Sequence, residues 1–293
     1  MPQIEFSEID PAASSALGES FAALVAGELG GARSAEALLR AVDFDQGVTR
    51  IIGGTLGPDL VTLNIFMPLR FRCMGSDITA YQSGFSATSH LHRGQGLWPR
   101  LMAFAENRLA ERGGSFIFGF PNPVSHPLFV KKLGYTSMGL FDLKVACFPF
   151  LFGRSFTAEP SAPPLTDALH PRFEDSVGWK RRADTGHAVV EAHSDGGRIW
   201  GKVRTVRKCG VSIRYLEVGS FDLDPGASLP NLFRAVAKAA EVRFIYVSLN
   251  PENRYFPLLR SMNYGQPIIV KSLDGFEIAG KSFNFFGGLR DTF

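Results

Sequence analysis

Cysteine is scarce in this sequence: three residues, Cys73, Cys147 and Cys209, are spread over 293 positions. An odd number of widely separated cysteines does not match a disulfide framework, and none lies in a CxxC pair of the kind that binds zinc. The sequence therefore argues against a disulfide-stapled secreted domain and predicts no metal site. We expect a reducing compartment, the cytoplasm.

Long apolar runs and an export signal are also missing. Glu5, Glu8 and Asp10 stand where a signal peptide would carry positive charge and then an apolar stretch. The longest apolar patches, such as 146–153, fall far short of the roughly 20 residues of a membrane-spanning helix. We therefore expect no membrane span and a cytoplasmic protein.

Net charge is low as well, at +3. This value is too small to indicate a nucleic-acid partner, but it is compatible with a small anionic ligand bound at a local basic site. The strand predicted near residue 200 carries alternating basic residues, Lys202 and Arg204, with Arg198, Arg207 and Lys208 nearby. They form either a solvated strand face or a contact for a phosphate of the ligand.

The length and composition predict two packed α/β units. A chain of 293 residues exceeds the usual size of one domain, and 45% hydrophobic residues suffice for a folded core throughout. In the first half the order of elements is βααβββαβαβ. Helices are expected at 13–29, 35–42, 97–112 and 126–132, and strands at 48–52, 59–66, 78–88, 115–120 and 135–145.

A proline-rich stretch separates the halves. Residues 148–182 hold five prolines and no sustained period, which predicts a linker between a domain at 1–147 and a second at 183–293. The second half is also α/β. We expect a strand or hairpin at 198–216, helices at 229–240 and 254–262, and strands at 244–249 and 267–273. A strand, an asparagine, a short helix and a glycine beside an aromatic residue recur in both halves, so the halves are either related or alike by coincidence.

The most informative segment is 86–98, where a strand leads into a glycine-bearing turn that opens a helix. Unpaired N–H groups at a helix start, with the helix dipole behind them, favour a phosphate or pyrophosphate, and glycine lets the backbone approach it closely. Arg93, Gly94 and Gly96 supply a positive charge and the two glycines. The segment therefore predicts an anion site.

At these residues the sequence resembles the GNAT superfamily of N-acetyltransferases, whose R-x-x-G-x-G/A motif binds the pyrophosphate of CoA at a helix start. Trp98 replaces the last small residue of the motif, as in the glycan-associated GNAT subset. That subset is also similar in the entry to the loop at Ser86 and Thr88, in the Gly-Phe-Pro-Asn turn at 119–122, and in Lys-Lys-Leu-Gly-aromatic at 131–135. The resemblance implies a GNAT-type mixed sheet with flanking helices, followed by a second GNAT-like or accessory unit.

The resemblance also implies a donor site for acetyl-CoA or another acyl-CoA, used as a co-substrate without metal. The strand before the loop should diverge from its neighbour, so that the pantetheine arm pairs with its free edge and a backbone N–H near Phe85 or Ser86 stabilises the oxyanion. Asn122 either contacts CoA or only caps the next helix. The implied donor residues are Phe85, Ser86, Ala87, Thr88, Arg93, Gly94, Gln95, Gly96, Leu97, Trp98 and Asn122.

The motif does not identify acid and base groups. The tyrosine that often protonates the leaving thiolate in this family would fall at Phe129 or Val130, neither of which can donate a proton. His126 and Tyr135 are the preferred catalytic candidates, because both lie close to the expected thioester and histidine titrates in a useful range. His90 and His92 flank the loop as further substitutes.

The acceptor is expected to be a small primary amine of low pKa, with an amino sugar preferred. Carboxylates are absent from 79–98 and from 113–141, so no strong base lines the expected cleft. A lysine-like amine would cost about 4 to 5 kcal/mol to deprotonate at neutral pH, whereas an amine with a pKa near 8 costs only about 1 kcal/mol. Homodimerisation is compatible with these expectations. The alternatives are a tandem-GNAT transferase that uses aminoacyl-tRNA, and a non-catalytic acyl-CoA-binding protein.

Overall fold

The structure is a computed structural model that describes residues 3–29, 34–42, 48–147, 169–175, 188–194, 196–224, 227–249 and 260–281, with residues 283 and 285. It is a mixed α/β fold, as expected. Most of the expected linker and the expected helix at 254–259 lie outside the described residues. The domain division at 147 and 183 stays a prediction.

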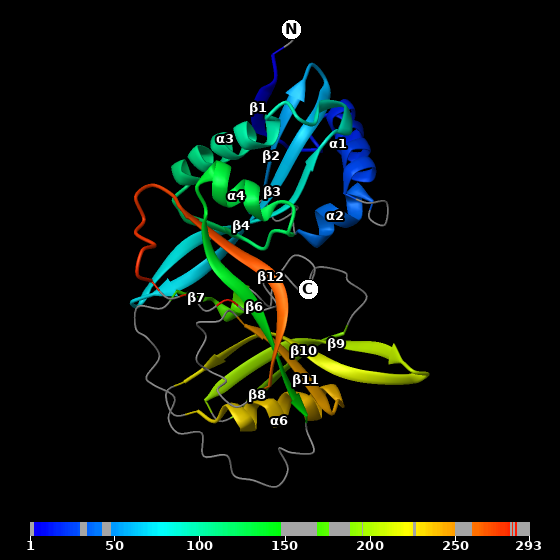
Figure 1. Cartoon of the computed structure of the whole chain (residues 1–293), viewed down its shortest axis with the longest axis vertical. Coiled ribbons are helices and arrows are strands. Elements are labelled where there is room, and N and C mark those ends of the chain that lie inside the picture. The colour runs from blue at the N-terminus through cyan, green and yellow to red at the C-terminus, as the bar shows by residue number, and fades with distance from the viewer. Residues whose placement is uncertain are drawn as a thin grey trace.

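The first half contains the expected elements in the expected order (Figure 1). Ser14 and Ser34 begin the first two helices by accepting hydrogen bonds from the backbone N–H groups of Leu17 and Ala37. Gly134, in a left-handed conformation, ends the last helix. The elements are β1 (Glu5–Glu8), α1 (Ser15–Glu28), α2 (Ala35–Ala41), β2 (Arg50–Leu56), β3 (Asp59–Cys73), β4 (Ser76–Thr88), the short 3₁₀ helix η2 (His90–His92), α3 (Leu97–Glu111), β5 (Gly114–Gly119), α4 (His126–Leu133) and β6 (Thr136–Cys147).

The second half is α/β too. Its elements are β8 (Val189–Ser194), β9 (Gly197–Lys208), β10 (Val211–Leu223), α6 (Leu229–Ala240), β11 (Phe244–Leu249) and β12 (Arg260–Ser272), and between the halves runs the short strand β7 (His170–Pro171). The expected helix was wrong at residues 260–262, because these residues pair with β6 as the start of β12. Pairing with a distant strand overrides the local helical spacing there.

All strands belong to one sheet, in which the halves exchange their last strands. The order is β1-β2-β3-β4-β5-β12-β6-β11-β10-β9-β8. Thus β12 lies between β5 and β6, and β6 lies between β12 and β11, with antiparallel pairing at each contact. Figure 1 shows β6 and β12 side by side where they join the upper and lower parts of the molecule. Each half therefore completes its part of the sheet with a strand of the other half.

The two halves repeat the same arrangement around one parallel strand pair. In the first half β4, α3 and β5 follow one another and β4 pairs with β5 in parallel; in the second, β10, α6 and β11 do the same. A β-bulge follows the parallel-paired part of both β4 and β10. The halves are thus similar in strand connection and in a local irregularity, which supports the GNAT-like second unit implied by the resemblance.

Helices cover both faces of the first half of the sheet (Figure 1). On one face, Leu101 and Leu109 of α3 pack with Phe66, Tyr81 and other residues in a shared cluster. On the other, Phe21 and Val25 of α1 pack with Leu38 of α2 and with the apolar side chains of β3. A third cluster, rich in phenylalanine, includes Phe116, Phe118, Phe283 and Phe285. These clusters fix the face on which each side chain of β4 lies.

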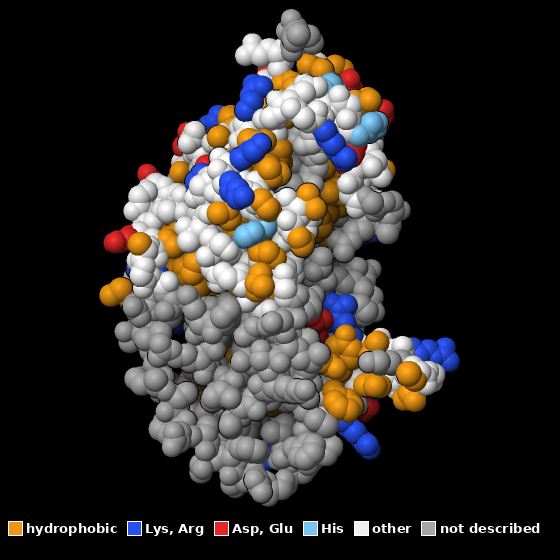
Figure 2. Space-filling view, in the orientation of Figure 1, with side chains coloured by type: hydrophobic (Ala, Val, Ile, Leu, Met, Phe, Trp, Pro, Cys, Tyr) orange, Lys and Arg blue, Asp and Glu red, His pale blue; other side chains and the backbone are white. Residues whose placement is uncertain are grey.

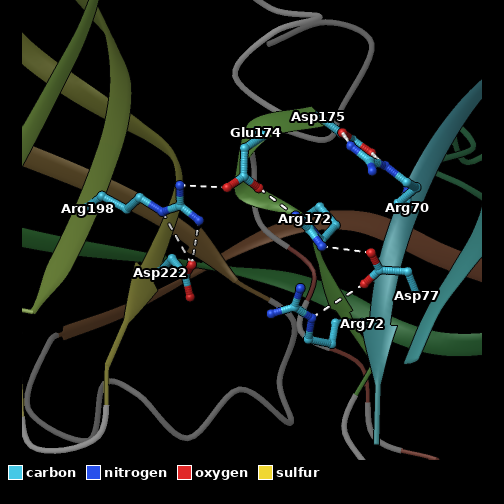
Figure 3. Close-up of polar contacts among 8 residues, drawn as sticks. All are labelled: Arg70, Arg72, Asp77, Arg172, Glu174, Asp175, Arg198 and Asp222. Atoms are coloured by element: carbon cyan, nitrogen blue, oxygen red, sulfur yellow. Dashed lines mark hydrogen bonds and ion pairs between the residues drawn. The ribbon is translucent and has the colours of Figure 1, made fainter. Parts of the chain in front are cut away.

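A ladder of charged side chains joins the two halves (Figure 3). Asp77 contacts Arg72 at 3.4 Å and Arg172 at 2.7 Å. Arg172 lies 3.5 Å from Glu174, which is 2.7 Å from Arg198. Arg198 in turn contacts Asp222 of β10 at 2.9 Å. We call these six residues the charge ladder; it runs from the β3–β4 hairpin through 169–175 to the second half.

The basic strand of the second half is not a solvated face. Lys202 is fully buried, and Arg204 pairs with Glu217 at 2.6 Å. Arg198 belongs to the charge ladder. Of the two alternatives, a solvated face does not describe Lys202, Arg204 and Arg198, which are buried or paired with acidic residues, whereas Arg207 is exposed.

Candidate functional site

The site is built around a gap between β4 and β5. These parallel strands pair from Thr79 with Gly114 to Ser83 with Gly119, where β5 ends, while β4 continues to Thr88. The edge of residues 84–88 that faces β5 therefore has no strand partner in the described part of the chain. This is the divergence that the sequence predicted, and it leaves a strand edge to which an extended ligand can bind.

A β-bulge lies at the start of this edge. The β3–β4 register passes from Ile65 opposite Gly84 to Leu63 opposite Ala87, so that Phe85 and Ser86 together face Asn64. Phe85 has a φ of 51°, which is uncommon for a bulky residue and turns the backbone locally. Bulges redirect the groups beside them, and this one changes the direction of the backbone N–H groups at the residues expected to hold the acyl carbonyl.

Asn64 is a functional candidate that sequence reasoning missed. Its side chain is fully buried, hydrogen-bonded to Ser86, and its Nδ2 donates to the Oγ of Ser83 at 3.1 Å. Two residue pairs further along, the Thr62 and Thr88 hydroxyls lie 2.9 Å apart. These contacts hold the bulge on both sides. The available signal was a single asparagine among mainly apolar residues in the first part of β3.

The glycine loop, residues 93–96, follows directly and has the left-handed backbone conformation that glycine can adopt. Gly94 and Gly96 have φ values of 79° and 69°, and Gly96 is the residue at which α3 begins. A side chain at either position would meet only open space, so backbone conformation, not crowding, favours glycine. Gln95 is exposed between them, and Leu97 is buried. Exposed N–H groups at the start of a helix are suited to binding an anion.

Glu28, at the end of α1, forms an ion pair with Arg93. The guanidinium contacts Glu28 and also lies 3.2 Å from the Thr88 carbonyl oxygen. Glu28 accepts a hydrogen bond from the His90 backbone N–H at 2.7 Å, and the His90 Nδ1 lies 2.9 Å from the same oxygen. The Glu28 side chain is 7% exposed and that of Arg93 60%. Arg93 thus both orders the loop and presents charge to solvent.

Trp98 packs against α4. Its ring meets that of Phe129 edge to face, with centroids 4.8 Å apart. Phe129 is 5% exposed and occupies one of the two positions where the family often has a tyrosine. The indole Nε1 of Trp98 is buried without a hydrogen-bond partner among the described residues. The aromatic pair therefore fills the space between α3 and α4.

Asn122 and His126 lie at the turn before α4. The Asn122 Oδ1 accepts hydrogen bonds from the backbone N–H groups of Val124 and Ser125, at 3.0 and 2.8 Å. Its oxygen therefore caps the turn, as in the plainer of the two expected roles. His126 is half-buried at the first position of α4, and its Nε2 lies 3.1 Å from the Ser137 hydroxyl.

Tyr135 lies in the core. It is 2% exposed, and burial, reinforced by the nearby Glu106 carboxylate, raises the pKa of its hydroxyl well above 10. Lys271 of β12 pairs with Glu106 at 2.7 Å and lies over the Tyr135 ring. This burial leaves a general-acid role for Tyr135 without support, because the hydroxyl is enclosed behind α3 and α4.

A polar recess of about 450 Å³ lies in the second half, between the β8–β9 turn and the end of β10. Arg198 and Asp222, which line it, are paired with each other. Asp224 directly follows β10 in the second half, and the basic glycine loop follows the equivalent strand, β4, in the first half. A negative charge disfavours phosphate, so we do not expect a second CoA site there.

The face that carries α3 and α4 is rich in Lys and Arg side chains (Figure 2). Lys131 and Lys132 at the end of α4 are exposed, as are Arg93 and Arg100. No cluster of potential metal ligands was found among the residues that the structure describes. Within the same residues, no helix has both the length and the apolar character needed to cross a membrane.

Comparison with known proteins adds family information. Residues 21–138 match the model of the acetyltransferase (GNAT) domain. A search of curated proteins found no match. Among solved structures, a GCN5-related N-acetyltransferase from Kribbella flavida is similar, with 16% identity, a TM-score of 0.59, and 93% of this chain and 71% of that chain covered.

Two further structures are similar over nearly the whole chain. One is a GCN5-related N-acetyltransferase from Anabaena variabilis, with 11% identity, a TM-score of 0.64, and coverage of 92% of this chain and 73% of that one. The other is a probable N-acyltransferase from Enterococcus faecalis, with 11% identity, a TM-score of 0.60 and the same coverage. At such identities the likeness shows the fold alone, and that fold extends across both halves. The match at 21–138 lies in the first half, so it is this part of the chain that is similar to the acetyltransferase (GNAT) domain in sequence.

Proposed function

We propose that this protein is an acyl-CoA-dependent N-acyltransferase that moves an acetyl group, or another short acyl group, to a primary amine. The observation that carries the proposal is the continuity of the site. The gap between β4 and β5, the bulge at Phe85 and Ser86, and the glycine loop at the start of α3 follow one another along a single stretch of chain.

The donor is assigned to that stretch. Backbone N–H groups of residues 93–98 and the charge of Arg93 bind the pyrophosphate. The pantetheine arm lies along residues 85–88, where its amides pair with the free edge of β4. Asn122 contributes by shaping the turn before α4, since its side-chain oxygen is already used there.

The chemistry is direct acyl transfer. The neutral amine attacks the thioester carbonyl carbon, a C–N bond forms, the C–S bond breaks, and the amine loses a proton. A backbone N–H at the bulge stabilises the oxyanion that develops on the carbonyl. The thiolate of CoA leaves and takes up a proton.

His126 is the proposed acid for the leaving thiolate. It begins α4, directly after the turn that follows β5, and its ring is held by Ser137. Tyr135 is set aside because its hydroxyl is buried in the core. Phe129, at a position where the family often has a tyrosine, has no proton to give.

An amino sugar is the proposed acceptor class. The low pKa of such an amine suits a cleft whose strand and loop residues 79–98 contain no carboxylate. The similarity of the loop and of the 119–122 and 131–135 segments to glycan-associated GNAT proteins supports the same class.

Calorimetric titration with acetyl-CoA tests the donor site. Gly94→Glu should weaken binding at least tenfold, equivalent to about 1.4 kcal/mol, because it places negative charge at the phosphate position. Gly75→Glu is a matched control. Gly75 has nearly the same backbone angle, φ 80° against 79°, and equally open surroundings, but lies in the β3–β4 turn at the far end of β4.

The control should bind like the wild type. If neither acetyl-CoA nor longer acyl-CoAs bind to the folded wild-type protein, the proposal fails and a transferase that uses aminoacyl-tRNA becomes the leading candidate. A non-catalytic acyl-CoA-binding protein is a second candidate, favoured by Phe129, whose buried ring packs against Trp98. Tight binding without turnover over a wide panel of amines would select it.

A further inference from the structure

Gln82 of β4 is a buried amide with no use in the fold. It is 1% exposed, and both its Oε1 and its Nε2 lack a hydrogen-bond partner among the described residues. Buried amides are nearly always hydrogen-bonded, because an unpaired donor and acceptor lose their contacts with water without compensation. A leucine or methionine would fill this buried position without an unpaired polar group. The amide therefore indicates a ligand that supplies the missing hydrogen bonds.

The side chain lies on the face of the sheet opposite α3. Side chains alternate along a strand, and Tyr81 belongs to the α3 cluster. Ala80, on the other face, belongs to the phenylalanine cluster, and Ala87, beyond the bulge, to the cluster under α1 and α2. The β3 neighbour of Gln82, Met67, belongs to the cluster under α1 and α2, and its β5 neighbour, Phe118, belongs to the phenylalanine cluster. Gln82 is therefore a polar side chain at the boundary between two apolar clusters, which we call the seam.

This seam adjoins the reaction centre. Ser83, the next residue, is the last of β4 to pair with β5, so Gln82 lies where the gap begins. It precedes Phe85 by three residues, about 10 Å along a strand. The glycine loop opens α3, so the donor approaches on the α3 side and the opposite face is left for the acceptor.

We propose that Gln82 binds the acceptor amine through a neutral hydrogen-bonding group at a distance from the reacting nitrogen. A carboxamide offers one acceptor and two donors and no charge. Its strand neighbours Met67 and Phe118 are apolar, so the surroundings disfavour a charged partner. A hydroxyl on the carbon skeleton of the acceptor, remote from the amine, fits both requirements. This inference rests on the proposed acyl transfer and narrows its acceptor to hydroxylated amines, which reach the amide through the gap.

The test compares two amines, D-glucosamine and cyclohexylamine, with acetyl-CoA as donor and the full chain as enzyme. Gln82→Met keeps a linear side chain and removes both polar atoms, and Gln82→Leu is a second variant should the first misfold. Met67→Leu, at the paired position of β3, is the apolar control. Each amine is compared with itself across variants, so the difference in amine pKa cancels.

Gln82→Met should lower kcat/KM for glucosamine at least tenfold, through KM, and change the value for cyclohexylamine less than twofold. The Kd for acetyl-CoA should stay the same and the thermal midpoint should not fall, as in Met67→Leu. Equal losses of kcat/KM for both amines, or an unchanged kcat/KM for glucosamine, would overturn the inference. So would wild-type protein that, when saturated with CoA, neither turns over nor binds glucosamine. Absence of acetyl-CoA binding would instead overturn the proposed function on which the inference rests.

Discussion

Glu28 and Arg93, 65 residues apart in the sequence, form an ion pair that ties the end of α1 to the glycine loop. The same carboxylate holds the backbone of His90, so one acidic side chain fixes both sides of the turn that precedes α3. A carboxylate next to an anion site would by its charge alone oppose binding of the anion. Its role is to order the loop while leaving the backbone N–H groups free to face the ligand.

Glu28→Gln should lower the free energy of unfolding by about 1 to 3 kcal/mol at pH 7, because charge-assisted hydrogen bonds are lost. Hydrogen bonds from the backbone and ring of His90, helped by the charge of Arg93, lower the pKa of Glu28. A carboxyl with a lowered folded-state pKa stabilises above its unfolded value of about 4.3 and loses this effect as pH falls through the folded value.

Urea unfolding of both proteins between pH 7 and pH 3 measures this effect. The difference in the free energy of unfolding between wild type and Glu28→Gln should be largest above about pH 5 and should vanish at the lowest pH of the series. A difference that stays constant over the whole range would show that the carboxylate charge is not the cause.

His126→Gln should reduce kcat about 100-fold while leaving the Kd for acetyl-CoA unchanged, because an amide can still bond to Ser137 but cannot protonate a thiolate. Steady-state rates across pH provide the measurement, and the limb that reports an essential acid should disappear. His193→Gln is the control, since His193 is 70% exposed on β8 in the second half. Equal activity of the two variants would remove His126 from the mechanism.

Arg172→Gln should destabilise the protein by about 1 kcal/mol, because it interrupts the charge ladder in its middle, at a side chain only 24% exposed. The matched variant Arg40→Gln breaks an exposed pair within α2, with side chains 53% and 80% exposed, and should cost under about 0.5 kcal/mol. Denaturant unfolding at low and at about 1 M salt compares them. Salt should reduce the loss of stability caused by Arg172→Gln. A loss of stability that does not depend on salt would mean that packing dominates.

Lys202→Met should be at least as stable as the wild type at pH 7. Desolvation, with a contribution from Arg204, lowers the pKa of Lys202 to about 8, and Glu217 keeps Arg204 as a partner when the lysine is removed. Between about pH 8 and 10.5 the unfolded chain holds a proton that the folded chain has released, so wild-type stability rises with pH in that window.

The advantage of Lys202→Met should therefore narrow from pH 8 to pH 10.5, by at most about 1.4 kcal/mol per pH unit. Unfolding midpoints at several pH values above 7 check this. Parallel curves for the two proteins over that window would contradict a lowered pKa for Lys202.

Much of the local structure at the proposed donor site was predictable because its signals are local. Gly94 and Gly96 permit a left-handed backbone, the apolar spacing of 97–112 predicts a helix, and the two meet within a few residues. The element order of the first half and the exact bounds of α6 and β11 follow from equally short patterns.

The remainder depends on residues that are far apart in the chain. No local pattern indicates that Glu28 reaches Arg93, that Lys202 is enclosed, or that Arg260–Ser272 inserts between β5 and β6. Asn64 and Gln82 are each the only amide side chain of their strand, but both strands contain other polar residues, so the sequence alone does not single them out. Only the packing of the sheet shows that one amide is satisfied and the other is not.

The exchange of β6 and β12 has a consequence for biosynthesis. The ribosome delivers β5 and β6 early, but the strand that separates them in the sheet is completed only at Ser272. At about 5 to 20 residues per second, the stretch from Cys147 to Ser272 takes on the order of 6 to 25 s to make. During that interval the sheet of the nascent first half lacks the strand that lies between β5 and β6.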